Sequence, residues 1–356
     1  MLNDDCLRIV VKHAALLAEA DFKPQQLSLE DPTLNRFAFR TPHLQALSLV
    51  DRQWREAAQL ELESVVLVTP TNYAAILRAM NERKIGRRVR TLIADRDWCR
   101  VDTDPRALDP ILEACEHLEE LFCDGFRMSF NSLVRMKSLA RLSLMNVAFY
   151  GGAPNVVMPG RLTHLVLHNT GFEMADFNTL VRACQGSLEF FQPRGIHPSQ
   201  LFAFHAILDA ACGTLRTLDL HLFSVQASIL RPFARPNLSF SQFKHFSRLE
   251  TLRIFSDEFS TALDSLSLST SAPSLRSLAL HRRPGPSGAG GDADVWEEPL
   301  TALLAALQAP VLSKLESLDI DMMRAWFDRA NGGVDSTPLY EVKEAAKARG
   351  IAVKVT

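Results

Sequence analysis

The sequence predicts an α/β fold in which short parallel strands alternate with helices along a repetitive solenoid. Three observations predict it. A phrase of the form leucine-x-x-leucine-x-leucine recurs along the chain. Segments with apolar residues at the helical spacing i, i+3, i+4 and i+7 lie between several copies, and a glycine follows two of these segments. The order helix, stop, strand therefore repeats, which places successive strands side by side in one sheet.

Eight clear copies of the phrase follow one degenerate copy. The clear copies begin at Leu118, Leu139, Leu162, Leu188, Leu215, Leu249, Leu275 and Leu315, and the degenerate copy begins at Val89. The first five clear copies are 21, 23, 26 and 27 residues apart. A period of about 20–29 residues with this phrase is typical of leucine-rich repeats, so residues 89–356 resemble that family. The resemblance implies a horseshoe with the parallel sheet on its concave face and helices outside.

Each copy predicts a short strand. Its second and third leucines point into the core, and the residues that flank them point to the opposite face, because strand side chains alternate. Helices that cover the core are predicted over residues 108–115, 177–184 and 204–211. Gly186 and Gly213 follow the last two of these helices, where a left-handed residue often ends a helix.

The solenoid is predicted to span residues 63–356. It opens with a lead-in strand at 63–68 and a helix at 73–80. It closes with a helix and a strand within 339–355, where Gly350 stops the helix. Such a terminal unit covers the end of the repeat core.

Two longer spacings indicate insertions between repeats. Residues 282–298 are rich in glycine, proline and aspartate, which predicts a flexible surface insertion. A phosphate-binding loop is disfavoured there because no lysine follows the glycines. Residues 223–246 hold several phenylalanines and prolines, so we expect an ordered loop.

Residues 1–62 do not repeat and are predicted to be helical. A first helix begins near Asn3, and Pro42 suits the first turn of a later helix. The later helix has the leucine, serine, valine and tryptophan-arginine order that resembles an F-box. The matching residues are Leu44, Leu47, Ser48, Val50, Trp54, Arg55 and Ala58. Asn3 stands where that family has a proline, and residues 17–40 are inserted as a loop between the helices. The layout resembles a fungal-type F-box protein with leucine-rich repeats.

This resemblance implies a substrate-recognition subunit of a Skp–cullin–F-box ubiquitin ligase. Apolar N-terminal residues would dock on a Skp-type adaptor protein, and through it on a cullin. The residues expected to bind the adaptor are Leu2, Leu7, Leu44, Leu47, Ser48, Val50 and Trp54. The repeats would hold an unknown target protein, so that catalysis would consist of proximity alone. The alternative is a stand-alone leucine-rich-repeat scaffold whose N-terminal helices only cap the solenoid.

The residues that flank the repeat leucines supply a candidate target-binding surface. This surface is acidic at both ends of the solenoid and mixed basic and aromatic in the middle. Arginines beside aromatic residues are typical of protein-binding hot spots. The residues expected to bind the target are Phe122, Arg141, His164, His168, Phe190, Arg194, His221, Arg253 and Phe255.

Composition and motifs argue against several other classes of protein. A formal net charge of −2 gives no electrostatic basis for binding nucleic acid or an anionic membrane. No apolar run reaches the roughly 18 residues of a membrane-spanning helix, and the N-terminus lacks the basic flank of a secretory signal, so we expect a cytoplasmic or nuclear protein. The six cysteines form no CxxC pair and are expected to be buried free thiols.

The sequence also predicts no enzyme chemistry. It contains no serine-nucleophile motif, no zinc-protease motif and no Walker lysine. His168, His221 and His281 hold the same position in alternate repeats, which places them roughly 10 Å apart and too far for one metal ion. We therefore expect no catalytic residues, no metal site and no cofactor.

Overall fold

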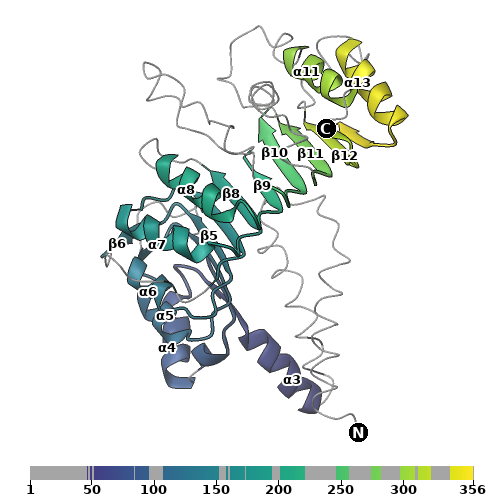
Figure 1. Cartoon of the computed structure of the whole chain (residues 1–356). Helices are drawn as coiled ribbons and strands as arrows, with labels where there is room; N and C mark the ends of the chain where they lie inside the picture. The colour runs from purple at the N-terminus through teal and green to yellow at the C-terminus, as the bar shows by residue number, and fades with distance from the viewer. Residues whose placement is uncertain are drawn as a thin grey trace, which may run out of the picture. The chain divides into compact units, whose positions relative to one another are not determined.

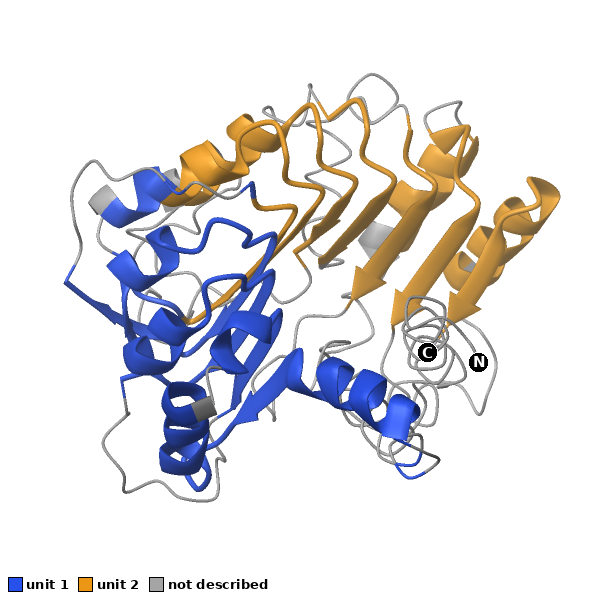
Figure 2. Ribbon diagram, turned by 90° about the horizontal axis from the view of Figure 1, so that it is seen from below, with its two compact units in different colours: residues 1–161, 170–179 blue, residues 162–169, 180–356 orange. Residues whose placement is uncertain are grey.

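Short parallel strands built on the recurring phrase form the frame of the structure, a computed structural model (Figure 1). The structure describes residues 46, 49, 52–83, 85–95, 107–151, 158, 161–172, 174–194, 201–220, 246–255, 274–281, 297–308, 312–321 and 337–355. In this part of the chain, eleven strands form one parallel sheet and two others form a small second sheet. The predicted α/β leucine-rich-repeat fold is confirmed. The chain divides into two compact units, 1–161 with 170–179 and 162–169 with 180–356 (Figure 2).

The first unit contributes β1, β2, β3 and β5 to the long sheet, in that order. Its elements are α3 (Arg52–Glu63), β1 (Val65–Val68), α4 (Tyr73–Arg83), η1 (Ile85–Arg88), β2 (Thr91–Asp95), α5 (Asp109–Ala114), β3 (Glu120–Asp124), β4 (Arg127–Ser129), α6 (Phe130–Val134), β5 (Arg141–Met145) and β6 (Ala148–Tyr150). Helix α7 (Met174–Cys184) has residues in both units.

The register of these strands explains why the leucines recur. Leu92, Leu121 and Leu142 lie opposite one another on β2, β3 and β5, and each is at most 1% exposed. Their alignment shows that the degenerate copy at Val89 is a true repeat. Val66 of β1 lies opposite Leu92 in the same way, so the sheet begins one strand earlier, at the lead-in segment.

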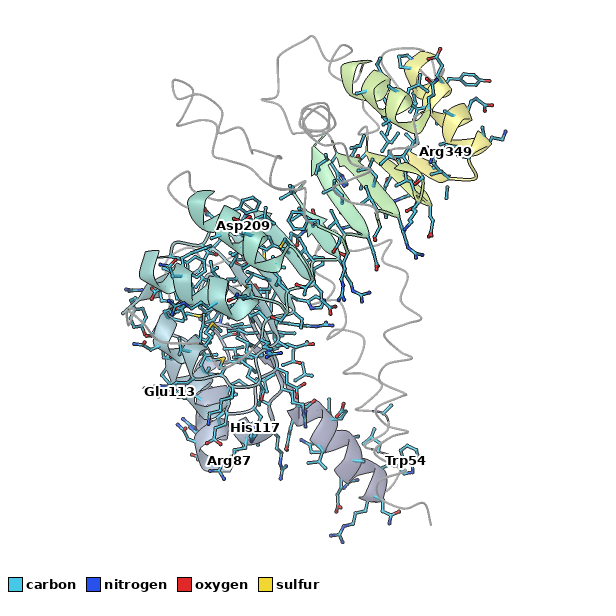
Figure 3. The ribbon with its side chains drawn as sticks, in the orientation of Figure 1. Trp54, Arg87, Glu113, His117, Asp209 and Arg349 are labelled. Carbon is cyan, nitrogen blue, oxygen red and sulfur yellow. The ribbon has the colours of Figure 1, made fainter. Side chains whose placement is uncertain are left out.

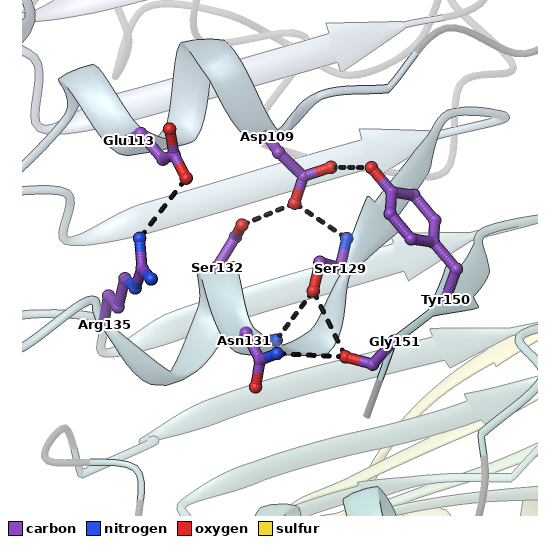
Figure 4. A network of polar contacts seen from close by, with 8 residues as sticks. All are labelled: Asp109, Glu113, Ser129, Asn131, Ser132, Arg135, Tyr150 and Gly151. Carbon is purple, nitrogen blue, oxygen red and sulfur yellow. Dashed lines mark hydrogen bonds and ion pairs between the residues drawn. The ribbon is translucent and has the colours of Figure 1, made fainter. Parts of the chain in front are cut away.

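A polar network that the sequence did not reveal joins α5, α6 and the small sheet of β4 and β6 (Figure 4). The Asp109 carboxylate accepts hydrogen bonds from the Ser129 backbone N–H at 2.8 Å and from the hydroxyls of Ser132 and Tyr150. The Arg127 guanidinium lies over the Tyr150 ring, 5.6 Å from its centroid. One carboxylate at the start of α5 therefore connects this helix with β4, α6 and β6.

The second unit contributes the strands from β7 to β13 in chain order. Its elements are β7 (His164–His168), β8 (Phe190–Arg194), α8 (Leu201–Ala211), β9 (Thr217–Asp219), β10 (Thr251–Phe255), β11 (Ser277–His281), α11 (Glu297–Gln308), β12 (Ser317–Asp321), α13 (Thr337–Ala348) and β13 (Ala352–Val355). Helix α11 was not predicted, and it takes in the last two residues of the expected insertion at 282–298. Helices α11 and α13 pack side by side (Figure 1).

The helix stops follow the prediction at two glycines and depart from it at a third. Gly186 has a φ of 68° and Gly350 a φ of 71°, the left-handed conformation that glycine adopts without strain. Gly213 has no positive φ. The expectation was wrong there because the Ala211 carbonyl accepts the N–H groups of two following residues at 2.9 Å, which turns the chain without a left-handed residue.

Three cysteines are buried and free, as expected. Cys115, Cys123 and Cys184 lie in the core of the repeats. Burial raises the pKa of the Cys115 and Cys184 thiols to about 12, and it also raises the pKa of Cys123. Cys212 is free but only partly buried, contrary to the prediction, because it lies in the turn that follows α8. Cys6 and Cys99 lie outside the described residues.

Candidate interaction surface

Among the residues expected to bind the adaptor, Trp54 is described. It lies on α3 and is partly exposed (Figure 3). Ala57 and Ala58 of the same helix are buried, at 7% and 0% exposure, while Arg55 is exposed. Helix α3 therefore packs one face inside the chain and leaves another face accessible. The other expected adaptor residues lie outside the described residues, namely Leu2, Leu7, Leu44, Leu47, Ser48 and Val50.

The residues that flank the second and third leucines form the face of the sheet that points away from the leucine core. We call it the outer face; it is the surface of the sheet on which the sequence analysis placed the target-binding residues. Phe122 of β3 belongs to this face but is only 3% exposed, so the expectation that it contacts a target was wrong. The register places its ring between Ile93 of β2 and Ser143 of β5. Neighbouring strands are about 4.8 Å apart, so these side chains crowd one another.

Several other predicted target-binding residues have neighbours on the outer face. The Arg141 guanidinium lies 3.5 Å from the Glu120 carboxylate. The His164 ring stacks on Phe190, with centroids 5.6 Å apart and an interplanar angle of 18°. His168 ends β7 and is partly exposed.

Three predicted target-binding residues have no described side chain. Arg194 and Phe255 are described by their backbone alone, at the ends of β8 and β10. His221 lies outside the described residues.

A row of hydrogen-bonded polar side chains crosses β8, β9 and β10 on the outer face. Asp219 is 0% exposed, and its Oδ2 accepts a hydrogen bond from Gln192 Nε2 at 2.9 Å and another from Arg253 Nη1 at 3.3 Å. The Arg253 side chain is 48% exposed. A buried carboxylate thus fixes an accessible guanidinium in place.

Sequence reasoning selected Arg253 from this row and missed Gln192 and Asp219. The signal was present, because the three residues occupy the same position in successive copies of the repeat. Asp219 is an acidic residue that the register places next to Arg253, and Gln192 is a polar residue that donates to Asp219. Their burial could not be seen from one repeat alone.

Two contacts between basic and acidic side chains occupy the outer face near the last strands of the second unit. His281 Nδ1 of β11 lies 3.3 Å from the Asp321 carboxylate of β12. Lys354 of β13 lies 3.6 Å from the Asp319 carboxylate of β12. Each of these two carboxylates therefore has a basic neighbour of its own.

The residues just before strands β8 to β12 alternate in charge, and we call them the charge row. They are Glu189, Arg216, Glu250, Arg276 and Glu316. The carbonyl of each accepts the N–H of the next, at 2.7–2.9 Å. Ion pairs join Arg216 to Glu250 at 3.5 Å and Arg276 to Glu316 at 3.0 Å. Their side chains are about half exposed, so each pair adds little to stability.

The described residues contain no group of three or more histidine, cysteine, aspartate or glutamate side chains that could hold a metal ion. In the same ranges, no helix is both long and apolar enough to cross a membrane.

The sequence matches no protein-family model and no curated protein. Among solved structures, an internalin from Listeria monocytogenes is similar over 87% of this chain and 92% of its own, with 12% sequence identity and a TM-score of 0.33.

Proposed function

We propose that this chain is a non-catalytic protein-interaction scaffold that serves as the substrate-recognition subunit of a Skp–cullin–F-box ubiquitin ligase. The outer face of the second unit would hold the target protein, and the N-terminal helices would dock on the adaptor. The observation that carries target binding is Arg253, a half-exposed arginine held by the buried Asp219, on the same face of the sheet as the stacked rings of His164 and Phe190. Arginine and aromatic side chains dominate the energetics of protein interfaces.

The adaptor role is supported by sequence order together with exposure. The F-box-like order includes Trp54, Arg55 and Ala58, which lie on a regular helix with one buried face. Leu49, which lies between Ser48 and Val50 of the same order, is 78% exposed. An apolar side chain in this position is suited to a partner that covers it.

Co-purification with a Skp-type adaptor tests the ligase role. We expect a stoichiometric complex with the full chain that is lost in Leu47→Asp and in Trp54→Ala. Tyr340→Ala is a matched control, because Tyr340 is an exposed aromatic residue on α13, 58% exposed and outside the F-box-like order. It should leave the complex intact.

The second candidate is a stand-alone scaffold in which the N-terminal helices only cap the solenoid. It is favoured if the wild-type chain forms no adaptor complex and runs as a single monomeric species. Unfolding of the repeats by Leu47→Asp would favour the same reading, because a capping residue supports the core. Circular dichroism of each variant separates lost binding from lost folding.

A further inference from the structure

A strip of four hydroxyl side chains crosses the outer face of the second unit. Its residues are Thr217, Thr251, Ser277 and Ser317, on β9, β10, β11 and β12. The register places each directly opposite the next. Because neighbouring strands are about 4.8 Å apart, the hydroxyls form an evenly spaced series. We call these four residues the hydroxyl strip.

The hydroxyl strip takes no part in internal hydrogen bonding within the described ranges. Other hydroxyls of the same unit bond to carbonyls of the preceding repeat, such as Ser187 to Leu162 at 2.9 Å and Thr214 to Leu188 at 2.8 Å. Within the described ranges the four strip hydroxyls have no such partner, and each of the four residues is partly exposed. They are therefore available as donors to a bound molecule.

Arg253 lies beside this strip and supplies its charge. It is two residues beyond Thr251 on β10, so both side chains point to the outer face. On the next strand its register partner is Ala279, which is too small to cover the guanidinium. Its hydrogen bond to Asp219 uses one Nη, and the fork retains further N–H donors.

Among the described residues, several other charged groups on this face or at its edge have neighbours of the opposite sign. Asp319 has Lys354 as its neighbour and Asp321 has His281, while Arg216 and Arg276 of the charge row face glutamates. The negative partner of Arg253 is fully buried, whereas the guanidinium is half exposed. An incoming carboxylate therefore meets an oriented cation flanked by hydroxyl donors.

We propose that Arg253 and the hydroxyl strip bind an extended acidic segment of the target protein. A glutamate or aspartate side chain of that segment pairs with the Arg253 guanidinium. Oxygen atoms of the segment next to this side chain accept hydrogen bonds from the hydroxyl strip. This inference rests on the proposed target-binding role of the outer face. It adds the chemical class of the target segment.

The test is fluorescence anisotropy of the full chain with a labelled peptide of alternating glutamate and serine. A second probe carries glutamine in place of every glutamate. We expect the glutamate probe to bind on the order of tenfold to a hundredfold more tightly, as for one charge-assisted hydrogen-bonded pair. Arg253→Gln should remove this preference, and Thr251→Val should weaken binding several-fold because it removes one strip hydroxyl.

Arg216→Gln is the matched control. Arg216 is 51% exposed and lies 3.5 Å from its carboxylate partner, close to the values for Arg253, but it belongs to the charge row. It should bind the glutamate probe as the wild type does. Arg253→Gln leaves the buried Asp219 carboxylate with one partner fewer. The double variant Asp219→Asn with Arg253→Gln removes both charges, and it should fold but also fail to bind the glutamate probe.

Equal affinity for the two probes would overturn the proposal, and so would equal losses in Arg216→Gln and Arg253→Gln. If binding requires phosphorylated serines in the probe, the recognised group is a phosphate rather than a carboxylate, and this result would also overturn the proposal. The adaptor complex is a separate readout, since Arg253→Gln should still co-purify with the adaptor. Peptide binding without any adaptor complex would uphold the acidic-segment site and reject the ligase role.

Discussion

Gln192 Nε2 donates a hydrogen bond of 2.9 Å to the carboxylate of Asp219, a fully buried side chain on the next strand. A buried carboxylate loses its hydration, so its remaining interactions must replace water. Gln192 and Arg253 together do so from opposite sides. The arrangement links the folding of three repeats to one charged group.

Replacing Asp219 should destabilise the second unit to a degree that depends on the substituent. Asp219→Ala leaves the Gln192 amide and the Arg253 guanidinium without their acceptor, which should cost about 2–3 kcal/mol. Asp219→Asn retains an acceptor oxygen but loses the charge, and it should cost about 1 kcal/mol. Urea unfolding followed by circular dichroism measures both. Equal losses in the two variants would mean that the side-chain volume, rather than the hydrogen bonds, is what matters.

Gly86 should tolerate no side chain. A Cβ at this position would lie 2.3 Å from the carbonyl oxygen of Ala114, where η1 approaches α5. Gly86→Ala must displace backbone, which should cost about 1–3 kcal/mol. Gly213→Ala is the matched control, because a Cβ there meets nothing within 4 Å and φ is not positive. Thermal unfolding should show a lower midpoint for the first variant and an unchanged or slightly higher one for the second. The reverse order would contradict the close approach of η1 to α5.

Tyr150 should make the first unit sensitive to alkaline pH. Its hydrogen bond to the Asp109 carboxylate, aided by partial burial and the negative charge of Asp109, raises the pKa of Tyr150 to about 12. The folded chain then holds this proton at pH values where the unfolded chain has begun to lose it. Stability from this group is complete below pH 10 and falls as pH rises from about 10 to about 12.

Urea unfolding of the wild type and Tyr150→Phe across this pH range tests the linkage. The wild type should lose more stability than the variant between pH 10 and 12, since the variant lacks the titrating hydroxyl. Parallel curves would show that Asp109 does not hold the phenol proton.

Arg349 should secure the C-terminal end of the solenoid. From the end of α13 (Figure 3) its guanidinium donates to the carbonyl of Leu307, in the last turn of α11, at 2.7 Å, and to that of Leu312, just after this helix, at 2.6 Å. Arg349→Met keeps much of the length but removes both hydrogen bonds, and Arg349→Lys can replace only part of the fork. We expect a loss of about 1–2 kcal/mol for methionine and less for lysine. Hydrogen exchange should show faster exchange in α13 and β13, with β8 and β9 unchanged. Uniform acceleration across all strands would contradict a local role.

The sheet could be predicted from the sequence because its determinant is local. Each copy of the phrase places two leucines at alternate positions, and burial at that period specifies a strand whatever surrounds it. The same logic identified the lead-in strand and the degenerate copy at Val89. The small sheet escaped prediction because β4 and β6 have three residues each, too few to establish a period.

Exposure on the outer face was harder to predict, because it depends on neighbouring repeats. Phe122 and Arg253 occupy equivalent positions, yet the first is buried and the second half exposed. The difference arises from register partners, Ile93 beside Phe122 and Ala279 beside Arg253. One repeat specifies where a side chain points, and the side chains across the ladder decide whether it reaches solvent.

The charge row restricts how a solenoid of this kind can change its length. Loss of the repeat that carries Arg216 would bring the carboxylates of Glu189 and Glu250 together, and duplication of any one repeat would place two like charges side by side. Loss of two adjacent repeats, those of Arg216 and Glu250, would leave Glu189 beside Arg276 and keep the alternation. Gain or loss of repeats in twos is therefore the electrostatically neutral route by which such a chain can lengthen or shorten.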